Sequence, residues 1–229
     1  MRDPYFPFHA LGFHSNPFRA LDDDEWAAIV LLPPALAEAA ARGGHLQVLG
    51  ERGRGKTSAL LGLAAQWRSA GQRAAYEYLP EGRDGFKTVL AGLEVFLLDE
   101  AQRLRGGERR RLLRAAAGGL RLVLGSHDDL TPLFARAGLP LASVRLEAGD
   151  TAHLAALLAR RLDYSALQPG QPGVTFEAGA VAFLASIFGS DLRAMERFLY
   201  EVFQDLEAPG TLTAEELRAA RARLAGQAH

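Results

Sequence analysis

The sequence predicts an α/β fold in which a parallel sheet, covered by helices on both faces, is followed by a small helical part. Up to about residue 148, short apolar runs alternate with helical periods, which is typical of parallel strands joined by crossover helices. A glycine-rich turn over residues 50–57 joins one apolar run directly to a helical period. From residue 151 onward only helical periods occur, and turns rich in glycine and proline separate them.

Composition excludes several classes of protein. The 229 residues carry a formal net charge of −1, so the balance of charge does not indicate a polybasic nucleic-acid binder. Cysteine is absent, which excludes disulfide frameworks, thiolate metal sites and cysteine nucleophiles. No apolar run approaches the ~20 residues of a membrane helix, and the N-terminus has no continuous apolar stretch of a secretory signal. We therefore expect a soluble cytoplasmic protein without a membrane span.

The N-terminal segment, residues 1–25, is expected to be irregular and to contact the α/β core. Proline and glycine interrupt any period there, at Pro4, Pro7, Gly12 and Pro17. The acidic run from Asp22 to Glu25 then offers an N-cap and first-turn carboxylates to a following helix.

The core is expected over residues 26–148. Five apolar runs predict its strands, at about His45–Leu49, Ala74–Leu79, Val95–Leu98, Leu120–Leu124 and Ser143–Leu146. Helical periods lie at about Ala35–Ala41, Ser58–Ser69, Phe86–Gly92 and Glu108–Ala117. A helical domain is expected over 149–229, with helices at about 151–162, 177–187, 190–206 and a final one at 213–224.

The turn from Gly50 to Thr57 fits the phosphate-loop pattern G-x-x-x-x-G-K-[ST] at every fixed position. Glycines let the backbone curl so that successive N–H groups point at phosphate oxygens, and the following helix adds its positive N-terminal end. Lys56 can bridge the β- and γ-phosphates, and the Thr57 hydroxyl can bind Mg²⁺. The expected nucleotide contacts are Gly50, Glu51, Arg52, Gly53, Arg54, Gly55, Lys56, Thr57 and Ser58.

An acidic pair, Asp99-Glu100, follows the third apolar run. A carboxylate at the carboxyl end of a parallel strand lies beside the phosphate loop in this architecture. Asp99 is expected to hold Mg²⁺, and Glu100 to polarise an attacking water. The alternative is an ordinary helix N-cap followed by a first-turn carboxylate.

The phosphate loop and V-F-L-L-D-E-A-Q together resemble the AAA+ P-loop ATPases, most of all the bacterial ExeA-type and TniB/TnsC-like ATPases. Further likeness lies in L-G-F-H-S-N-P-F near the N-terminus, in V-R-L-E-A-G-D-T-A-H-L-A-A-L-L-A-R-R-L, and in F-G-S-D-L-R-A-M. The resemblance implies a three-layer core with a five-stranded parallel sheet, and a small C-terminal all-helical lid domain.

The same resemblance implies roles for residues outside the two motifs. Gly189-Ser190-Asp191-Leu192-Arg193 resembles a sensor-2 motif, in which Arg193 contacts the γ-phosphate. Gly125-Ser126-His127 resembles the sensor-1 position, with Ser126 as the first choice and His127 as the second. Phe18, in Asn16-Pro17-Phe18, would pack against adenine or serve as a hydrophobic staple.

The family further implies a homo-oligomer with an arginine finger supplied in trans, for which Arg136 and Arg145 are both candidates. Two departures limit the likeness. The connection Pro80–Glu94 is too short for the usual pore-lining element. With one helical period after the lid, we expect no winged-helix DNA-binding domain.

Six arginines crowd one short stretch of the chain. They could contact duplex DNA, contact a protein partner such as a neighbouring subunit, or form a solvated helix face. These residues are Arg103, Arg105, Arg109, Arg110, Arg111 and Arg114.

The predicted function is Mg²⁺-dependent hydrolysis of ATP to ADP and phosphate, in which Glu100, Lys56, Arg193 and Ser126 act on the reaction. ATP-dependent oligomerisation would be coupled to assembly on DNA or on a partner complex. The alternative is a nucleotide-gated interaction switch with little hydrolysis and no DNA. The acidic pair argues against a small-molecule kinase, because water is the wrong acceptor for that reaction.

Overall fold

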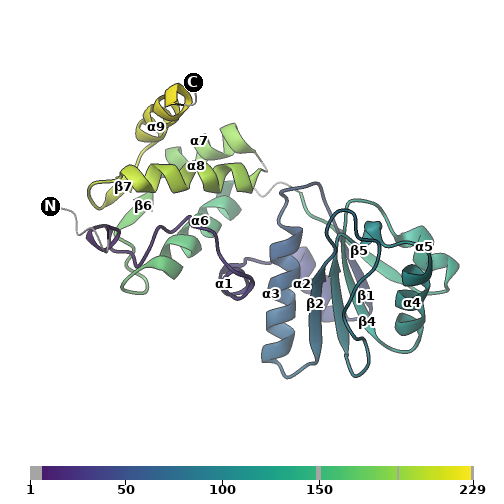
Figure 1. The fold of residues 1–229 in the computed structure, drawn as a ribbon. Coiled ribbons are helices and arrows are strands. Elements are labelled where there is room, and N and C mark those ends of the chain that lie inside the picture. The colour runs from purple at the N-terminus through teal and green to yellow at the C-terminus, as the bar shows by residue number, and fades with distance from the viewer. Residues whose placement is uncertain (1–6, 148–150, 190, 228–229) are drawn as a thin grey trace. The chain divides into compact units, whose positions relative to one another are not determined.

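The computed structural model describes residues 7–147, 151–189 and 191–227 (Figure 1). These residues form two compact units. The α/β unit runs from Asp22 to Glu147, and the helical unit combines the described residues before Asp22 with those after residue 150. The boundary expected at residue 148 lies outside the described residues.

The α/β unit is built on a five-stranded parallel sheet in the order β2-β3-β4-β1-β5, as expected for a P-loop AAA+ α/β fold. The strands are β1 (His45–Leu49), β2 (Ala74–Tyr78), β3 (Val95–Asp99), β4 (Arg121–Ser126) and β5 (Leu141–Arg145). Because every strand runs in the same direction, the carboxyl ends of all five meet at one edge of the sheet.

Side chains of each central strand are buried on both faces. In β3, Val95 and Leu97 belong to one apolar cluster, while Phe96 and Leu98 belong to another on the opposite face. Successive side chains of a strand point to opposite faces, so a strand that is covered twice is apolar throughout. This burial explains why the strands read as unbroken apolar runs.

Helices α2 and α3 cover one face of the sheet, and α4 and α5 cover the other (Figure 1). The helices are α1 (Asp23–Ile29), α2 (Pro34–Arg42), α3 (Lys56–Ser69), α4 (Gly106–Ala117) and α5 (Thr131–Arg136). Helix α1 packs on α3, and the Asp22 side chain caps it by accepting from the Glu25 N–H at 2.9 Å. The acidic run therefore supplies the predicted N-cap.

The short helix expected at Phe86–Gly92 is wrong, because the connection from β2 to β3 has no helix. The Glu77 carboxylate accepts from the backbone N–H groups of Lys87 and Thr88, at 2.8 Å each. The Glu77 carboxylate thus binds the backbone of this segment, and the chain follows an irregular path there.

The helical unit contains α6 (Thr151–Ser165), α7 (Ala178–Phe188), α8 (Leu192–Asp205) and α9 (Ala214–Gln227), with a 3₁₀ turn, η1 (His9–Leu11). The unit is helical as expected, but β6 (Val174–Phe176) and β7 (Gly210–Leu212) add a two-stranded parallel sheet to it. None of the helices within the described ranges combines the length and apolar character needed to cross a bilayer.

The described part of the N-terminal segment up to Leu21 belongs to the helical unit, and Asp22 begins the α/β unit. Phe13 is fully buried in the apolar cluster of this unit. The backbone joins it as well, since the His14 N–H donates to the Ser165 carbonyl at 2.9 Å. The buried Arg161 guanidinium donates to the Arg19 carbonyl at 2.6 Å. Aromatic burial and backbone pairing thus tie this segment to α6.

Candidate functional site

The phosphate loop joins the end of β1 to the start of α3. Gly55 is the N-cap of α3 and has φ +81°, a left-handed conformation that glycine adopts without steric cost. The first N–H groups of a helix have no acceptor within it, so those of α3 point toward the loop. This is the geometry that binds phosphate at helix N-termini.

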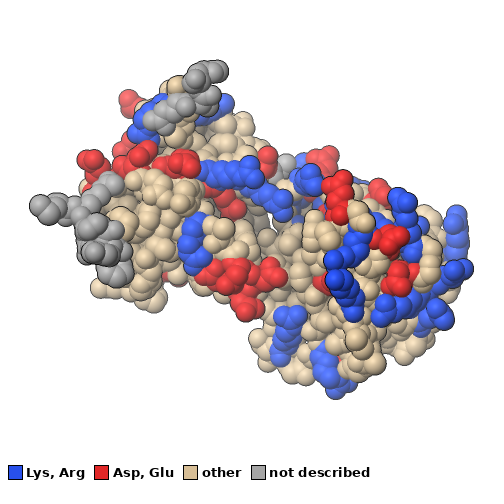
Figure 2. Space-filling model, in the orientation of Figure 1, with Lys and Arg blue, Asp and Glu red and all other residues tan. Residues whose placement is uncertain are grey.

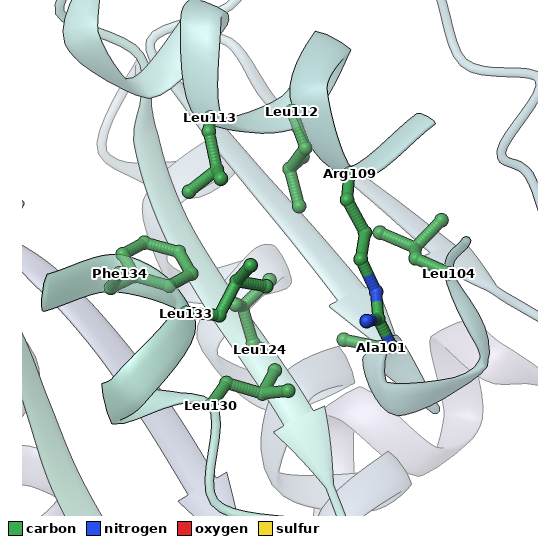
Figure 3. Close-up of a pocket in the computed structure, with 9 residues that line it drawn as sticks. All are labelled: Ala101, Leu104, Arg109, Leu112, Leu113, Leu124, Leu130, Leu133 and Phe134. Atoms are coloured by element: carbon green, nitrogen blue, oxygen red, sulfur yellow. The ribbon is translucent and has the colours of Figure 1, made fainter. Parts of the chain in front are cut away.

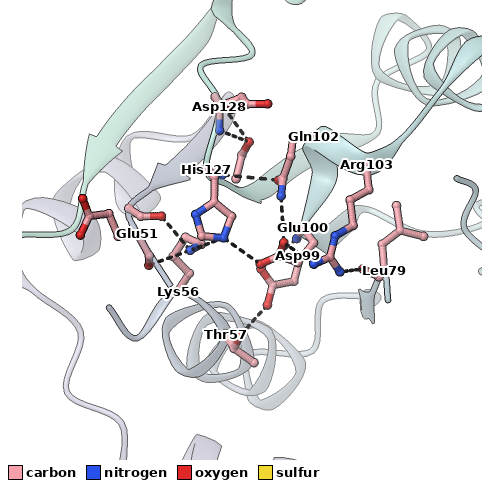
Figure 4. Close-up of polar contacts among 12 residues, drawn as sticks. Glu51, Lys56, Thr57, Leu79, Asp99, Glu100, Gln102, Arg103, His127 and Asp128 are labelled. Atoms are coloured by element: carbon pink, nitrogen blue, oxygen red, sulfur yellow. Dashed lines mark hydrogen bonds and ion pairs between the residues drawn. The ribbon is translucent and has the colours of Figure 1, made fainter. Parts of the chain in front are cut away.

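Lys56 is the first residue of α3, and only 5% of it is exposed. Its ammonium donates to the carbonyl oxygens of Gly50 at 2.8 Å and of Glu51 at 3.0 Å (Figure 4). The cation is thus held inside the loop, where a phosphate oxygen would meet it. Arg54 is half-buried and pairs with the exposed Glu51 carboxylate at 3.4 Å.

Thr57 and Asp99 meet although 42 positions separate them in the sequence. The Thr57 hydroxyl donates to Asp99 Oδ2 at 2.6 Å, and Asp99 is fully buried at the end of β3. Burial raises the pKa of the Asp99 carboxyl, and the hydrogen bond from Thr57 opposes that rise. The Tyr76 hydroxyl also lies 3.5 Å from Oδ2. Hydroxyl and carboxylate oxygens are the hard donors that Mg²⁺ prefers, so the donor set fits this ion.

Gly125 leaves room for the Asp99 carboxylate on the neighbouring strand. A Cβ atom at position 125 would lie 2.4 Å from Asp99 Oδ1, closer than real contacts allow. A glycine at this position of β4 is therefore required sterically by the acidic residue beside it.

Glu100 follows Asp99 in a left-handed conformation with φ +60°, and it alone does so among the non-glycine residues within the described ranges. Its two carboxylate oxygens meet three side chains (Figure 4). Oε1 lies 3.2 Å from His127 Nε2, whereas Oε2 lies 2.8 Å from Gln102 Nε2 and 3.1 Å from an Arg103 nitrogen. The carboxylate therefore sits in a polar cage between the ends of β3 and β4.

The residue after β4 that reaches this cage is His127, the second choice for sensor 1. His127 Nε2 lies 3.4 Å from Lys56 Nζ, so the imidazole is placed between Lys56 and Glu100. Ser126 is fully buried and bonds within its own loop. Its hydroxyl donates to the Asp128 carbonyl at 2.7 Å and accepts from the Asp128 N–H at 3.0 Å. In this structure Ser126 shapes the loop, and His127 faces the site.

The remaining expected site residues belong to the helical unit. Arg193 is exposed in the first turn of α8, whose N-cap Asp191 accepts from the Ala194 N–H at 3.0 Å. Ser190 of the sensor-2 motif lies outside the described residues. Phe18 is only 4% exposed and packs edge-on against Phe203, with ring centroids 5.1 Å apart. Its ring thus belongs to the apolar cluster of the helical unit, and its contact with adenine stays a prediction.

The six clustered arginines divide into two groups. Three are engaged by their own unit. Arg103 contacts Glu100, Arg109 donates to the Gln102 carbonyl at 3.1 Å, and Arg111 pairs with Glu108 at 3.1 Å. The other three are more open to solvent or bonded only within their own helix, namely Arg105, Arg110 and Arg114. Figure 2 shows basic side chains gathered over the α/β unit with acidic ones among them. The surface available to a polyanion is therefore smaller than the sequence suggests.

The two candidate arginine fingers, Arg136 and Arg145, are both exposed in the α/β unit, at the ends of α5 and β5. Nothing in their contacts separates them.

A small and mostly apolar pocket lies between β4 and the helices α4 and α5 (Figure 3). It has room for about one water molecule. Its lining comes from the turn after β3, from β4, and from α4 and α5 with the residues that flank them, and comprises Ala101, Leu104, Arg109, Leu112, Leu113, Leu124, Leu130, Leu133 and Phe134. A pocket of this size holds no nucleotide.

Sequence reasoning missed Gln102, Arg103 and Tyr76. Gln102 and Arg103 lie two and three residues after Glu100, where a tight turn brings their side chains back to its carboxylate. Tyr76 faces Asp99 from the neighbouring strand, and strand pairing cannot be read from one apolar run.

No protein-family model matches the chain, and no curated protein shows significant similarity to it. Solved structures do share its fold. The RuvB Holliday junction branch migration motor of Thermotoga maritima superposes with a TM-score of 0.58 at 19% identity, covering 83% of this chain and 66% of RuvB. A DNA replication initiation factor gives 0.55 at 15% identity, covering 82% and 62%. NtrX from Brucella abortus in complex with ADP gives 0.54 at 16% identity, covering 87% and 61%.

These likenesses support the P-loop AAA+ fold. The chain spans between 61% and 66% of the length of these three proteins.

Proposed function

We propose that this chain binds ATP with Mg²⁺ at the phosphate loop and hydrolyses it to ADP and phosphate. The observation that carries the proposal is the 2.6 Å contact between the Thr57 hydroxyl and the Asp99 carboxylate, beside the buried Lys56. Two motifs far apart in the sequence thus place a cation, a hydroxyl and a carboxylate at the carboxyl edge of one parallel sheet, where nucleotide sites of this architecture lie.

Each residue has a defined task in this proposal. The N–H groups of the loop from Gly50 to Ser58 hold phosphate oxygens, and Lys56 neutralises the charge between the β- and γ-phosphates. Thr57 and Asp99 would hold Mg²⁺, which supplies positive charge to the phosphate oxygens when bound.

Glu100 is proposed to orient and polarise the attacking water, because its carboxylate lies at the same edge as Lys56 and Asp99. His127 is proposed to sense the γ-phosphate, since its imidazole lies 3.4 Å from Lys56 Nζ and 3.2 Å from Glu100. Ser126 would then support the loop. Arg193 of the helical unit is proposed to contact the γ-phosphate.

For the biological role, we propose a general class of process and no particular partner. RuvB and the replication initiation factor act on DNA according to their names, which favours a role in a DNA transaction. Arg105, Arg110 and Arg114 would contact duplex DNA or an acidic protein surface. We also propose an ATP-dependent homo-oligomer, with Arg136 or Arg145 as the arginine finger, in a cytoplasmic regulator similar to the ExeA-type and TniB/TnsC-like ATPases.

The alternative is a nucleotide-gated interaction switch that hydrolyses ATP poorly and does not use DNA. One observation favours it, namely that both oxygens of Glu100 already contact donor groups of the protein. A carboxylate held in this way is a poorer acceptor for a proton from water.

Two variants test the ATPase proposal. Lys56→Ala should abolish tight binding of a fluorescent ATP analogue, because the loop loses the buried cation that would meet the β- and γ-phosphates. Glu100→Gln should preserve binding and lower the turnover number at least about 100-fold. Arg42→Ala, at an exposed position at the end of α2, is the control and should change both quantities little.

Steady-state hydrolysis should be followed against protein concentration, with and without duplex DNA. Turnover of Glu100→Gln at the wild-type rate would disprove the assignment of the base. A low specific rate that ignores both protein concentration and DNA would favour the switch.

A further inference from the structure

The turn after β3 folds the chain back onto Glu100. Glu100 adopts a left-handed conformation, with φ 60° and ψ 37°, which L residues with a side chain rarely take. The next three residues form the 3₁₀ turn η2 (Ala101–Arg103), in which the Arg103 N–H donates to the Glu100 carbonyl at 3.0 Å. Side chains three residues apart in a 3₁₀ turn lie one above the other, so the Arg103 guanidinium returns over the Glu100 carboxylate.

Arg103 is fixed at both ends of its guanidinium. One nitrogen lies 3.1 Å from Glu100 Oε2, and another donates to the Leu79 carbonyl at 2.6 Å (Figure 4). The second nitrogen also donates to the Tyr78 hydroxyl at 3.3 Å. The guanidinium therefore joins the end of β2 to the carboxylate at the end of β3. Because only 19% of the Arg103 side chain is exposed, little solvent screens the ion pair.

Gln102 adds a second restraint on the same oxygen. Its amide nitrogen donates to Glu100 Oε2 at 2.8 Å, and its amide oxygen faces the His127 N–H at 3.4 Å. Its backbone carbonyl accepts from Arg109 of α4 at 3.1 Å. The position of Gln102 is thus set by α4 and by the loop after β4.

We propose that Arg103, supported by Gln102, is a positioning residue that restrains the Glu100 carboxylate and slows ATP hydrolysis. The proposal rests on the proposed role of Glu100 as the base. A water molecule must donate a hydrogen bond to this carboxylate as its proton is withdrawn, and a guanidinium on Oε2 reduces the pull of the carboxylate on that proton. Hydrolysis then requires the Arg103 contact to loosen, which makes the turn from Ala101 to Arg103 the point where turnover is limited.

This position gives Arg103 a different role from its neighbours in the arginine cluster. Arg105 is exposed, so a polyanion would meet Arg105 before Arg103. Arg103 directs its donors to a carbonyl, a phenol and a carboxylate of its own unit, so the sequence-based assignment to a DNA surface does not fit its contacts.

The test compares Arg103→Gln, Arg103→Lys and the control Arg42→Gln in the full chain, without nucleic acid. Arg103→Gln removes the charge from Oε2 and should raise the turnover number about threefold to tenfold, with the KM for ATP within about twofold of wild type. Arg103→Lys keeps a cation near Glu100 and should stay close to wild type. Arg42→Gln makes the same change in net charge at an exposed position at the end of α2 and should leave the rate unchanged.

The double variant Arg103→Gln/Glu100→Gln shows whether the gain passes through Glu100. It should be as inactive as Glu100→Gln alone, and thermal unfolding curves should show that each variant is folded. If Arg103→Gln does not fold, Gln102→Ala replaces it and should raise turnover by a smaller factor.

An unchanged or lower turnover number in folded Arg103→Gln would overturn the restraint, and so would a gain that persists in the double variant. Two other results would show that the proposed function itself is wrong. In the first, Glu100→Gln turns over at the wild-type rate, and in the second, the wild-type chain does not bind ATP. Either of those results would remove the restraint together with the base.

Discussion

The ends of β3 and β4 lie side by side in the sheet, and each ends in two adjacent polar residues, but the two ends use them differently. At β3 both Asp99 and Glu100 reach the site, through Thr57 and through His127. At β4 only His127 reaches it, because Ser126 bonds to Asp128 of its own loop.

The difference follows from the number of atoms that each side chain offers. Asp99 has two oxygens, so Oδ1 accepts from the Glu100 N–H at 3.0 Å while Oδ2 accepts from Thr57. Ser126 has one hydroxyl proton, and it is committed to the Asp128 carbonyl. A carboxylate at a strand end can therefore hold its turn and serve the site together, whereas a serine that holds its turn has no proton left for a ligand.

The strongest test of this comparison is Asp99→Asn. We expect the turnover number to fall at least about 100-fold, because an amide lacks the charge that would hold Mg²⁺ beside the phosphates. Titration of the rate with Mg²⁺ should show a weaker apparent affinity for the metal. Asp128→Asn, an exposed carboxylate in the neighbouring loop, is the control and should retain the wild-type rate.

The same variant should change the pH dependence of stability. Since burial raises the folded-state pKa of Asp99 above its unfolded value of about 3.9, the folded state binds this proton more tightly. The contribution of Asp99 to the free energy of unfolding is therefore favourable at low pH and is lost as the pH rises through the folded-state pKa. Asp99→Asn should be more stable than wild type at neutral pH without nucleotide. Denaturant unfolding at several pH values measures this difference, and a less stable variant at neutral pH would contradict the prediction.

The second test concerns the other strand end. His127→Ala should lower the turnover number about tenfold to a hundredfold, because the imidazole is the group placed between Lys56 and Glu100. Binding of the ATP analogue should weaken less, since the phosphate loop is intact. His14→Ala, an exposed histidine of the helical unit, is the control. A wild-type rate for His127→Ala would show that proximity at this strand end carries no function.

The parts of the fold that follow from short-range rules could be predicted from the sequence. Strands such as β3 read as apolar runs because both faces are buried, and the spacing of Gly50, Lys56 and Thr57 is enough to mark the phosphate loop. The sequence also predicts that Asp99 and Glu100 lie near that loop, since parallel strands bring their carboxyl ends to one edge.

Other features depend on contacts that sequence spacing does not show. The segment expected to be a helix, Phe86–Gly92, is irregular, and Glu77 binds its backbone from the end of β2. The choice between Ser126 and His127 depends on a turn that a serine hydroxyl closes, and the place of Arg103 depends on the left-handed Glu100. A strained or hydrogen-bonded turn changes the direction of a side chain without changing the apolar pattern.

The smallest effect is expected for Ser126→Ala, and it separates the two sensor assignments most sharply. If the hydroxyl only closes the loop after β4, its removal should lower the free energy of unfolding by about 1 kcal/mol and leave the turnover number within about twofold of wild type. Ser186→Ala, which removes an exposed hydroxyl that donates to the Phe183 carbonyl at 2.7 Å, should cost less stability. Denaturant unfolding and steady-state hydrolysis measure the two quantities on the same samples. A tenfold loss of turnover with unchanged stability would mean that Ser126 leaves its loop and acts on the nucleotide, so that both strand ends would supply two residues to the site.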